Sequence, residues 1–378
     1  MNVDNLKLIT PDFESSLVDV LFELDHVRRL KLGGSTHPMI FFQLKSIFHM
    51  LESVGSARIE GNRTTISEYV EKKIVDGEHK TEQFSEIANV EKAMEFIESS
   101  IHQDMPLSHQ FIRELHYLTV CDLSTEGDKT PGAYRTWSVE ISQSPHSPPE
   151  HYLVQQYMDN LLNFINEKSS NKHDLLKIAQ AHHIFTWIHP FGNGNGRTVR
   201  LLTYALLIKY GFNVKDGGIL NPSAVFFNDR NKYYEMLSVA DKGTDESILK
   251  WTEYVLSGIL EEIEKINKLT DYTFLSERIL LPSILHSKER GLINDTEYKI
   301  LTLGISKQII ASKDISTAGI GLTSRQTSSI ITNLKNSKLI VPIEEGARKY
   351  YINFSNSYLL RSVIIMLEKE NFIPELNK

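Results

Sequence analysis

The chain has 378 residues, 41% of them hydrophobic, which is long and apolar enough for two or three domains with well-filled cores. A formal net charge of −7 argues against wholesale binding to nucleic acid or to a membrane surface, although a local basic face remains compatible with it. The single cysteine, Cys121, excludes an internal disulfide and a cysteine-ligated zinc site. The first residues match neither a signal peptide nor a membrane span, so a soluble cytoplasmic protein is expected.

The first hundred residues are predicted to be a helical region. Apolar residues recur at helical spacing over residues 15–31 and again over 39–54, with a glycine-containing and proline-containing loop between them. The stretch that follows is a helix end capped by Gly61 and Asn62. Glu60 lies at this end, where its charge opposes the helix dipole, so a cationic partner elsewhere is expected. An ordinary exposed carboxylate is the alternative.

A change of pattern follows two more amphipathic helices, predicted at residues 87–101 and 109–119. Residues 132–141 have an alternating pattern with β-favouring side chains, and residues 142–149 are rich in turn-forming residues. Together they predict a short β-hairpin. The edge of such a hairpin can hold an extended peptide by main-chain hydrogen bonds; a plain connecting hairpin is the alternative.

The most informative stretch, residues 189–200, reads HPFGNGNGRTVR. Helical spacing of apolar residues before and after it predicts a loop between two helices, one over 174–187 and one starting near Asn195. Pro190 ends the first helix because it lacks an N–H and disfavours helical backbone in the residue before it. This leaves His189 at the start of the loop.

The chemistry of this loop is suited to an anion. Its three glycines, Gly192, Gly194 and Gly196, let backbone N–H groups converge on a ligand, and the next helix directs its positive end to the same point. Arg197 and Arg200 are one turn apart, so both guanidinium groups can reach nucleotide phosphates. The neutral imidazole of His189 can take a proton from a hydroxyl. The combination indicates phosphoryl-type transfer.

The stretch resembles the signature of the Fic family, HPFx(D/E)GNGRxxR, and matches all but one of its specified positions. Fic enzymes are best known for moving AMP from ATP to a Ser, Thr or Tyr hydroxyl of a target protein. The resemblance implies a mainly α-helical Fic core, with the predicted hairpin as a flap over the active site and His189 as the base. It also implies that the nucleotide phosphates are bound by Gly192, Asn193, Gly194, Asn195, Gly196, Arg197 and Arg200.

The single departure is Asn193, which stands where the family has an Asp or Glu ligand for magnesium. The resemblance implies Mg²⁺ as the cofactor. An amide oxygen can coordinate this ion but carries no charge, so weaker metal binding is expected at Asn193.

A second resemblance concerns the helix end before residue 62. Ser56 and Glu60 match the family's inhibitory motif, (S/T)xxxE(G/N). In relatives this glutamate pairs with the second arginine of the signature, here Arg200, and blocks productive seating of the distal phosphate. Because the motif precedes the signature in the same chain, the resemblance implies intramolecular inhibition.

Residues 228–237 resemble the segment that closes the nucleotide base pocket in relatives. Tyr234 is the candidate contact with the adenine, although neighbouring tyrosines on a helix are more often divided between core and surface. Asp241 stands where several relatives offer an asparagine to the base. A helix over 251–266 then completes the catalytic core.

The last hundred residues have a different organisation. Helices are predicted at 294–310, 313–318 and 323–337, followed by a β-hairpin over 339–352, which suggests a winged helix-turn-helix. From residue 271 onwards 14 Lys and Arg stand against 11 Asp and Glu. The candidate DNA contacts are Arg325, Gln326, Lys335, Lys338, Arg348 and Lys349. Such a unit can also bind protein or mediate a homodimer.

The sequence therefore predicts an N-terminal helical region with the inhibitory motif (1–100), a Fic catalytic core (101–270) and a winged-helix domain (271–378). The predicted function is that of an autoinhibited protein adenylyltransferase, with an unidentified target protein or the chain itself as acceptor and no membrane partner. Two alternatives remain: a DNA-binding regulator whose Fic core senses nucleotide, or a Fic enzyme that removes AMP or uses another nucleotide donor.

Overall fold

The computed structural model describes residues 3–29, 34–74, 81–141, 145–168, 171–212, 221–317 and 323–373. The chain divides into two compact units, which are treated separately below. Unit 1 comprises residues 1–31, 48–64 and 78–264, and unit 2 comprises residues 32–47, 65–77 and 265–378. Both units draw on the first hundred residues, whereas the predicted three-domain division remains a prediction.

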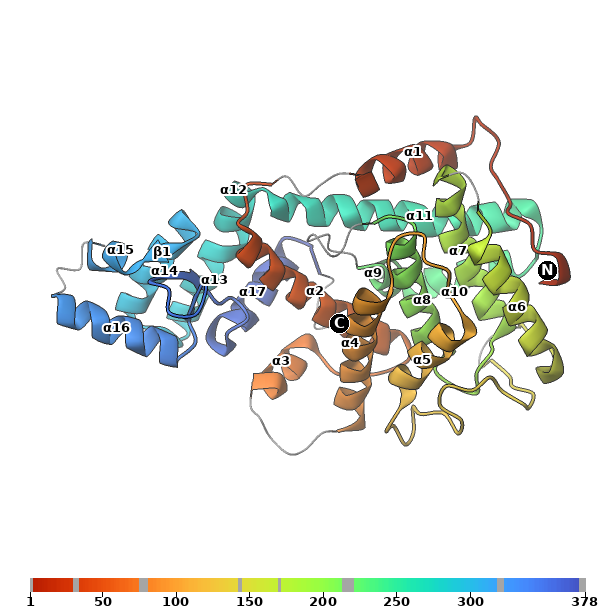
Figure 1. Ribbon diagram of the computed structural model, residues 1–378, viewed down its shortest axis with the longest axis horizontal. Coiled ribbons are helices and arrows are strands. Elements are labelled where there is room, and N and C mark those ends of the chain that lie inside the picture. Colours follow the sequence, from red (N-terminus) through yellow and green to blue (C-terminus); the bar gives the residue numbers. More distant parts are fainter. Residues whose placement is uncertain are drawn as a thin grey trace. The chain divides into compact units, whose positions relative to one another are not determined.

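Unit 1 is a helical bundle around one central helix, α8. Every residue of α8 except Gly196 is buried, and α8 packs against α7 on one side and against α4 and α5 on the other (Figure 1). The helices of unit 1 are α1 (Ser16–Arg29), the end of α2 (Pro38–Ile59), α4 (Glu82–Ser100), α5 (His109–Val120), α6 (Val154–Asn166), α7 (Asn171–Ile188), α8 (Asn195–Lys209), α9 (Ser223–Asn228), α10 (Arg230–Ala240) and α11 (Asp245–Asn267), with 3-10 turns at Val3–Asn5 and His151–Leu153.

The predicted cap at the end of α2 is confirmed. Gly61 has φ +108, a conformation that glycine adopts without strain, and the Asn62 N–H donates to the carbonyl of Ala57. The reversed chain direction after Gly61 brings Asn62 to α4, where its side chain donates to the Gln83 carbonyl over 2.9 Å. Asn62 therefore stabilises the C-terminal turn of α2 by hydrogen bonds to both α2 and α4.

The β-hairpin predicted over residues 132–141 is wrong: residues 132–141 and 145–150 contain no strand. The backbone groups of this segment form hydrogen bonds with partners outside a sheet. The Arg135 N–H donates to the Pro190 carbonyl over 2.9 Å, and the Arg135 guanidinium binds the carbonyls of Trp137 and Pro149. Hydrogen bonds made by one buried arginine therefore take the place of the strand-to-strand hydrogen bonds of a hairpin. Part of the predicted tip, residues 142–144, lies outside the described residues.

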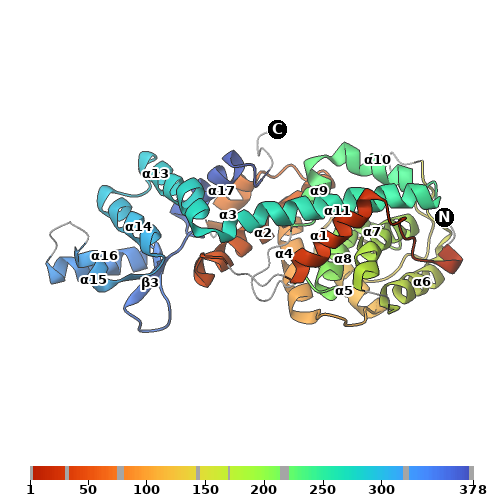
Figure 2. The same ribbon diagram turned by 90° about the horizontal axis from the view of Figure 1, so that it is seen from above.

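Unit 2 contains a small antiparallel sheet with the strand order β1-β3-β2. The central strand β3 is labelled in Figure 2. Ile310 pairs with Tyr350, and Val341 pairs with Tyr351. The elements of unit 2 are the start of α2, α3 (Ile66–Ile74), α12 (Tyr272–Phe274), α13 (Leu281–Glu289), α14 (Asp295–Lys307), β1 (Ile310–Ala311), α15 (Ser312–Thr317), α16 (Ser324–Asn336), β2 (Ile340–Pro342), β3 (Lys349–Ile352) and α17 (Ser357–Lys369), with a 3-10 turn at Lys268–Thr270 and a π-helical turn at Leu275–Leu280.

The predicted succession of three helices and a hairpin near the C-terminus is present, with two differences. The helix predicted to reach Ile310 ends at Lys307, because Gln308 has φ +62 and Ile310 enters strand β1. Helix α16 starts with a capping box in which Thr323 and Gln326 bind each other's backbone N–H groups. Across the described residues of both units, no helix combines the length and the apolar content needed to cross a bilayer.

Candidate active site

Residues 189–194 join α7 to α8 and, together with Asn195 at the start of α8, are here called the motif loop. His189 follows α7 with φ +50, a left-handed conformation that costs energy in a residue other than glycine. Arg135 stabilises it: its Nε donates to the His189 carbonyl over 2.8 Å, and only 2% of Arg135 is exposed. Arg135 lies in the segment predicted to be a hairpin, and no local pattern relates it to His189, 54 residues away.

The His189 side chain is half-buried at the start of this loop. Burial lowers the pKa of its imidazole to about 4, and a backbone contact with Thr186 only partly opposes this effect. The imidazole is therefore neutral near pH 7, which is the form that a general base requires.

The interior of the motif loop is braced by its own side chains. Asn195 accepts a hydrogen bond from the Phe191 N–H and donates one to the Phe191 carbonyl. The Phe191 ring is fully buried and stacks on His116 at a centroid distance of 3.7 Å. His116 accepts a hydrogen bond from the Gly132 N–H at Nδ1, so its Nε2–H can donate to the Asn193 carbonyl. The Asn195 amide, expected on the phosphates, therefore stabilises the loop in this structure.

Two glycines of the loop leave no room for a larger residue. A Cβ atom at Gly192 would lie 2.7 Å from the Trp137 ring, and one at Gly194, which has φ +73, would lie 2.5 Å from Val120. Close packing and backbone conformation both require glycine here. Gly194 directly precedes α8, where free N–H groups and the helix dipole favour an anion.

A carboxylate already lies at this helix start. A Cβ atom added to Gly196 would lie 2.1 Å from Oε1 of Glu60 and 3.2 Å from Nη1 of Arg200. The Glu60 carboxylate thus occupies the neighbourhood in which the sequence predicts an anionic phosphate. Its side chain is 28% exposed, so solvent reaches it.

The Arg200 guanidinium binds both residues of the predicted inhibitory motif. Its Nη2 donates to Glu60 Oε1 over 2.7 Å and to the Ser56 carbonyl over 2.9 Å, and its Nε donates to Ser56 Oγ over 2.9 Å. Burial by itself raises the pKa of Glu60, but the charges of Arg200 and Arg197 outweigh this effect and the pKa is lowered. The Glu60 carboxylate is therefore charged at neutral pH.

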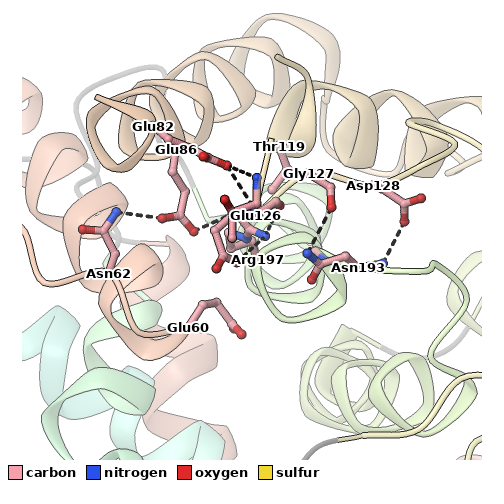
Figure 3. A network of polar contacts seen from close by, with 12 residues as sticks. Glu60, Asn62, Glu82, Glu86, Thr119, Glu126, Gly127, Asp128, Asn193 and Arg197 are labelled. Carbon is pink, nitrogen blue, oxygen red and sulfur yellow. Dashed lines mark hydrogen bonds and ion pairs between the residues drawn. The ribbon is translucent and has the colours of Figure 1, made fainter. Parts of the chain in front are cut away.

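The Arg197 guanidinium lies in a separate network, drawn in Figure 3. Its Nη1 donates to Glu86 Oε1 over 2.7 Å, and its Nη2 donates to the Glu126 carbonyl over 2.8 Å. The other oxygen of Glu86 accepts from Asn62 over 2.7 Å. Burial raises the pKa of Glu86, although the charge of Arg197 opposes this. Glu86 could not be found from the sequence pattern, because the predicted helix started at residue 87, whereas α4 starts at Glu82 and includes Glu86 on its buried face.

Each arginine keeps one buried donor without a partner in the described part of the chain: Nε of Arg197 and Nη1 of Arg200. An unsatisfied buried donor costs about 1–3 kcal/mol. Two such donors on cationic groups beside a helix start are suited to an anion with several oxygens.

The environment of Asn193 does not fit the usual carboxylate site for Mg²⁺. Its Oδ1 accepts from the Gly194 N–H over 2.7 Å. Its Nδ2 donates to the Gly127 carbonyl over 3.0 Å (Figure 3). The nearby Asp128 carboxylate accepts from the Asn193 N–H over 2.7 Å. No cluster of three or more His, Cys, Asp or Glu side chains able to hold a metal occurs among the described residues. The expected Mg²⁺ cofactor therefore remains a prediction.

The two tyrosines of α10 divide between core and surface. Tyr233 is buried, and its hydroxyl contacts Nε2 of His182 at 3.0 Å. Tyr234 is 40% exposed, and the Arg230 guanidinium lies 5.4 Å from the centre of its ring. Asp241, at the end of α10, contacts Nε2 of His183 at 2.9 Å. The proposed contact of Tyr234 with a base remains a prediction.

Comparison with known proteins identifies similar sequences. Residues 106–207 match the model of the Fic/DOC family. The protein adenylyltransferase Fic of Drosophila virilis is 30% identical over 248 residues, which cover 64% of this chain and 45% of that protein. The protein of the same name from Drosophila yakuba is 33% identical over 201 residues, which cover 52% of this chain and 37% of that protein. The chain thus spans less than half the length of these curated relatives.

Among solved structures, a Fic family protein from Desulfovibrio desulfuricans superposes with a TM-score of 0.56 at 18% identity. The match covers 92% of this chain and 98% of the other. At this level of identity the likeness concerns the fold.

Proposed function

Because residues 106–207 form a Fic/DOC domain, we propose that this protein is an autoinhibited protein adenylyltransferase. It transfers AMP from ATP to a Ser, Thr or Tyr hydroxyl of a target protein, and its targets include the chain itself. The adenylyltransferases among its relatives support the reaction class.

The observation that carries the proposal is the position of the Glu60 carboxylate. It binds Arg200 at 2.7 Å and lies against Gly196 at the start of α8. A distal phosphate needs the same guanidinium and the same helix start. Glu60 and the nucleotide therefore compete, and the enzyme is inhibited while Glu60 stays in place.

The reaction follows from the groups around the motif loop. Neutral His189 takes the proton of the target hydroxyl, whose oxygen forms a bond to the α-phosphorus of ATP. The bond from that phosphorus to the bridging oxygen breaks, and pyrophosphate leaves. Arg200, once free of Glu60, and the N–H groups at the start of α8 stabilise the charge that develops on the phosphates.

The test uses ATP labelled on the α-phosphate. Purified wild type, Glu60→Gly and Glu60→Gly/His189→Ala are incubated with it, and label on protein is read. We expect more label with Glu60→Gly than with wild type, and none with the double variant. Absence of label in Glu60→Gly would refute transfer from ATP. The same incubation with GTP, CTP and UTP, and with AMP-modified protein, then tests the other donors and AMP removal.

A second function, DNA binding by the C-terminal elements, is favoured by the surface of α16. We propose that residues 294–352 are a winged helix-turn-helix with α16 as the helix that enters the major groove. No acidic residue occurs between residues 315 and 343. The exposed side chains of α16 are hydroxyls, amides and bases, namely Ser324, Arg325, Gln326, Ser328, Ser329, Thr332, Asn333, Lys335 and Asn336.

DNA binding is tested with the full chain and a library of random duplexes, followed by titration of the selected sequence. Arg325→Ala should weaken binding about fivefold to 150-fold, because a good base contact contributes about 1–3 kcal/mol. Arg278→Ala is the control, since Arg278 lies outside the proposed unit and its side chain is 63% exposed. Failure to enrich any duplex would refute this function without bearing on AMP transfer.

A further inference from the structure

We propose that Glu86 is a positioning residue for Arg197: it holds the guanidinium from the buried side and leaves one donor of that group for a nucleotide phosphate. The inference rests on the proposed function, because it assumes that Arg197 contacts the nucleotide. It adds a carboxylate that neither the signature nor the inhibitory motif contains.

The contacts give the Arg197 guanidinium one orientation. Glu86 Oε1 binds Nη1 at 2.7 Å and the Glu126 carbonyl binds Nη2 at 2.8 Å, from two different segments. The side chains of Arg197 and Glu86 are 1% and 2% exposed. A planar guanidinium bound at both terminal nitrogens in a buried site cannot rotate without breaking a charge-assisted bond. Its remaining buried donor without a partner in the described residues is Nε.

A second inhibitory carboxylate is the competing explanation, and burial decides against it. Glu60 is 28% exposed and lies against Gly196, so an incoming phosphate reaches it and can displace it. Glu86 is buried on α4, where displacement would leave a desolvated carboxylate without its cation. Glu86 therefore stays in place when nucleotide binds, and it supports Arg197 instead of competing for it.

Asn62 links Glu86 to the turn that carries Glu60. Its Nδ2 donates to Glu86 Oε2 over 2.7 Å (Figure 3). The same Nδ2 donates to the Gln83 carbonyl over 2.9 Å. Asn62 follows Glu60 by two residues and is 8% exposed. One buried amide thus orients Glu86 and also fixes the turn that carries Glu60.

The experiment measures ADP affinity by calorimetry on the full chain, with Glu60→Gly as the background so that Arg200 is free. Glu86→Gln should weaken ADP binding about tenfold or more, because it removes the buried carboxylate partner of Arg197 and leaves only the Glu126 carboxylate, which lies 3.6 Å from Nη2 and is 41% exposed. Glu95→Gln, on an exposed position of the same helix, is the control and should change the affinity less than twofold. In an Arg197→Ala background, Glu86→Gln should add less than twofold, which a general loss of stability would not predict.

Unchanged ADP affinity in Glu86→Gln, or an equal loss with and without Arg197, would overturn the inference. If thermal melting shows that Glu86→Gln does not fold, Asn62→Ala replaces it: weaker ADP binding by a few-fold supports the inference and unchanged binding overturns it. If the Glu60→Gly background binds no ADP at all, the proposed function itself fails, which separates the two outcomes.

Discussion

The contact between Glu60 and Arg200 sets the expected strength of inhibition. Glu60→Gln keeps the size of the side chain but removes the charge that holds Nη2 at 2.7 Å. A hydrogen bond between charged groups contributes about 1.5–3 kcal/mol, and each 1.4 kcal/mol corresponds to a tenfold change in affinity. In the proposed competition a distal phosphate displaces this carboxylate, so the substitution should raise nucleotide affinity about 10-fold to 150-fold.

The assay is titration of ADP and of a non-hydrolysable ATP analogue, compared with AMP. AMP lacks the distal phosphates, so its affinity should change much less than that of ADP. Glu95→Gln serves again as the exposed control. Equal affinities of wild type and Glu60→Gln for the ATP analogue would refute the competition between Glu60 and the phosphate. An equal gain for AMP would show that Glu60 obstructs another part of the nucleotide.

Three further predictions concern the motif loop. Burial lowers the pKa of His189 to about 4, so the imidazole is neutral above that pH. The labelling rate of Glu60→Gly should therefore stay level from pH 8 to 6 and fall as the pH approaches 4. Label counted after a fixed time at each pH checks this. Asn193→Asp adds the charge that Mg²⁺ prefers and should lower the magnesium concentration for half-maximal labelling, whereas Asn193→Ala should not; an unchanged midpoint in Asn193→Asp would contradict the interpretation. Arg135→Ala should lower the labelling rate at least tenfold and lower the melting temperature, because it removes the bonds to the His189, Trp137 and Pro149 carbonyls; Arg63→Ala is the exposed control.

Short-range features of the sequence predicted most helices correctly. The helices that flank the motif loop, the glycine cap after Ile59 and the helix start at Ser324 all depend on residues within a few positions of each other. Apolar periodicity, proline, glycine and capping side chains act at that range, so they can be recognised without the fold. His189, Gly194 and Arg200 can likewise be recognised as candidate site residues without the fold, because they lie in one contiguous signature.

The failed hairpin shows where local patterns stop being sufficient. Residues 132–141 have the composition of a strand, but a strand needs a partner for its backbone groups, and here Arg135 and the end of α7 supply other partners. Tertiary contacts override the local preference, because β-propensity depends strongly on the surroundings.

The groups that residues 189–200 offer can be read from the local sequence: an imidazole, glycine-rich backbone, a helix start and two arginines. Which partners these groups bind depends on the packing of segments that are far apart in the chain. Glu60 is 140 residues from Arg200, and Glu86 is 111 residues from Arg197. Nothing in local periodicity relates such positions. Their pairing arises because α2 and α4 pack around α8, and a buried guanidinium there must be matched by a buried or half-buried carboxylate.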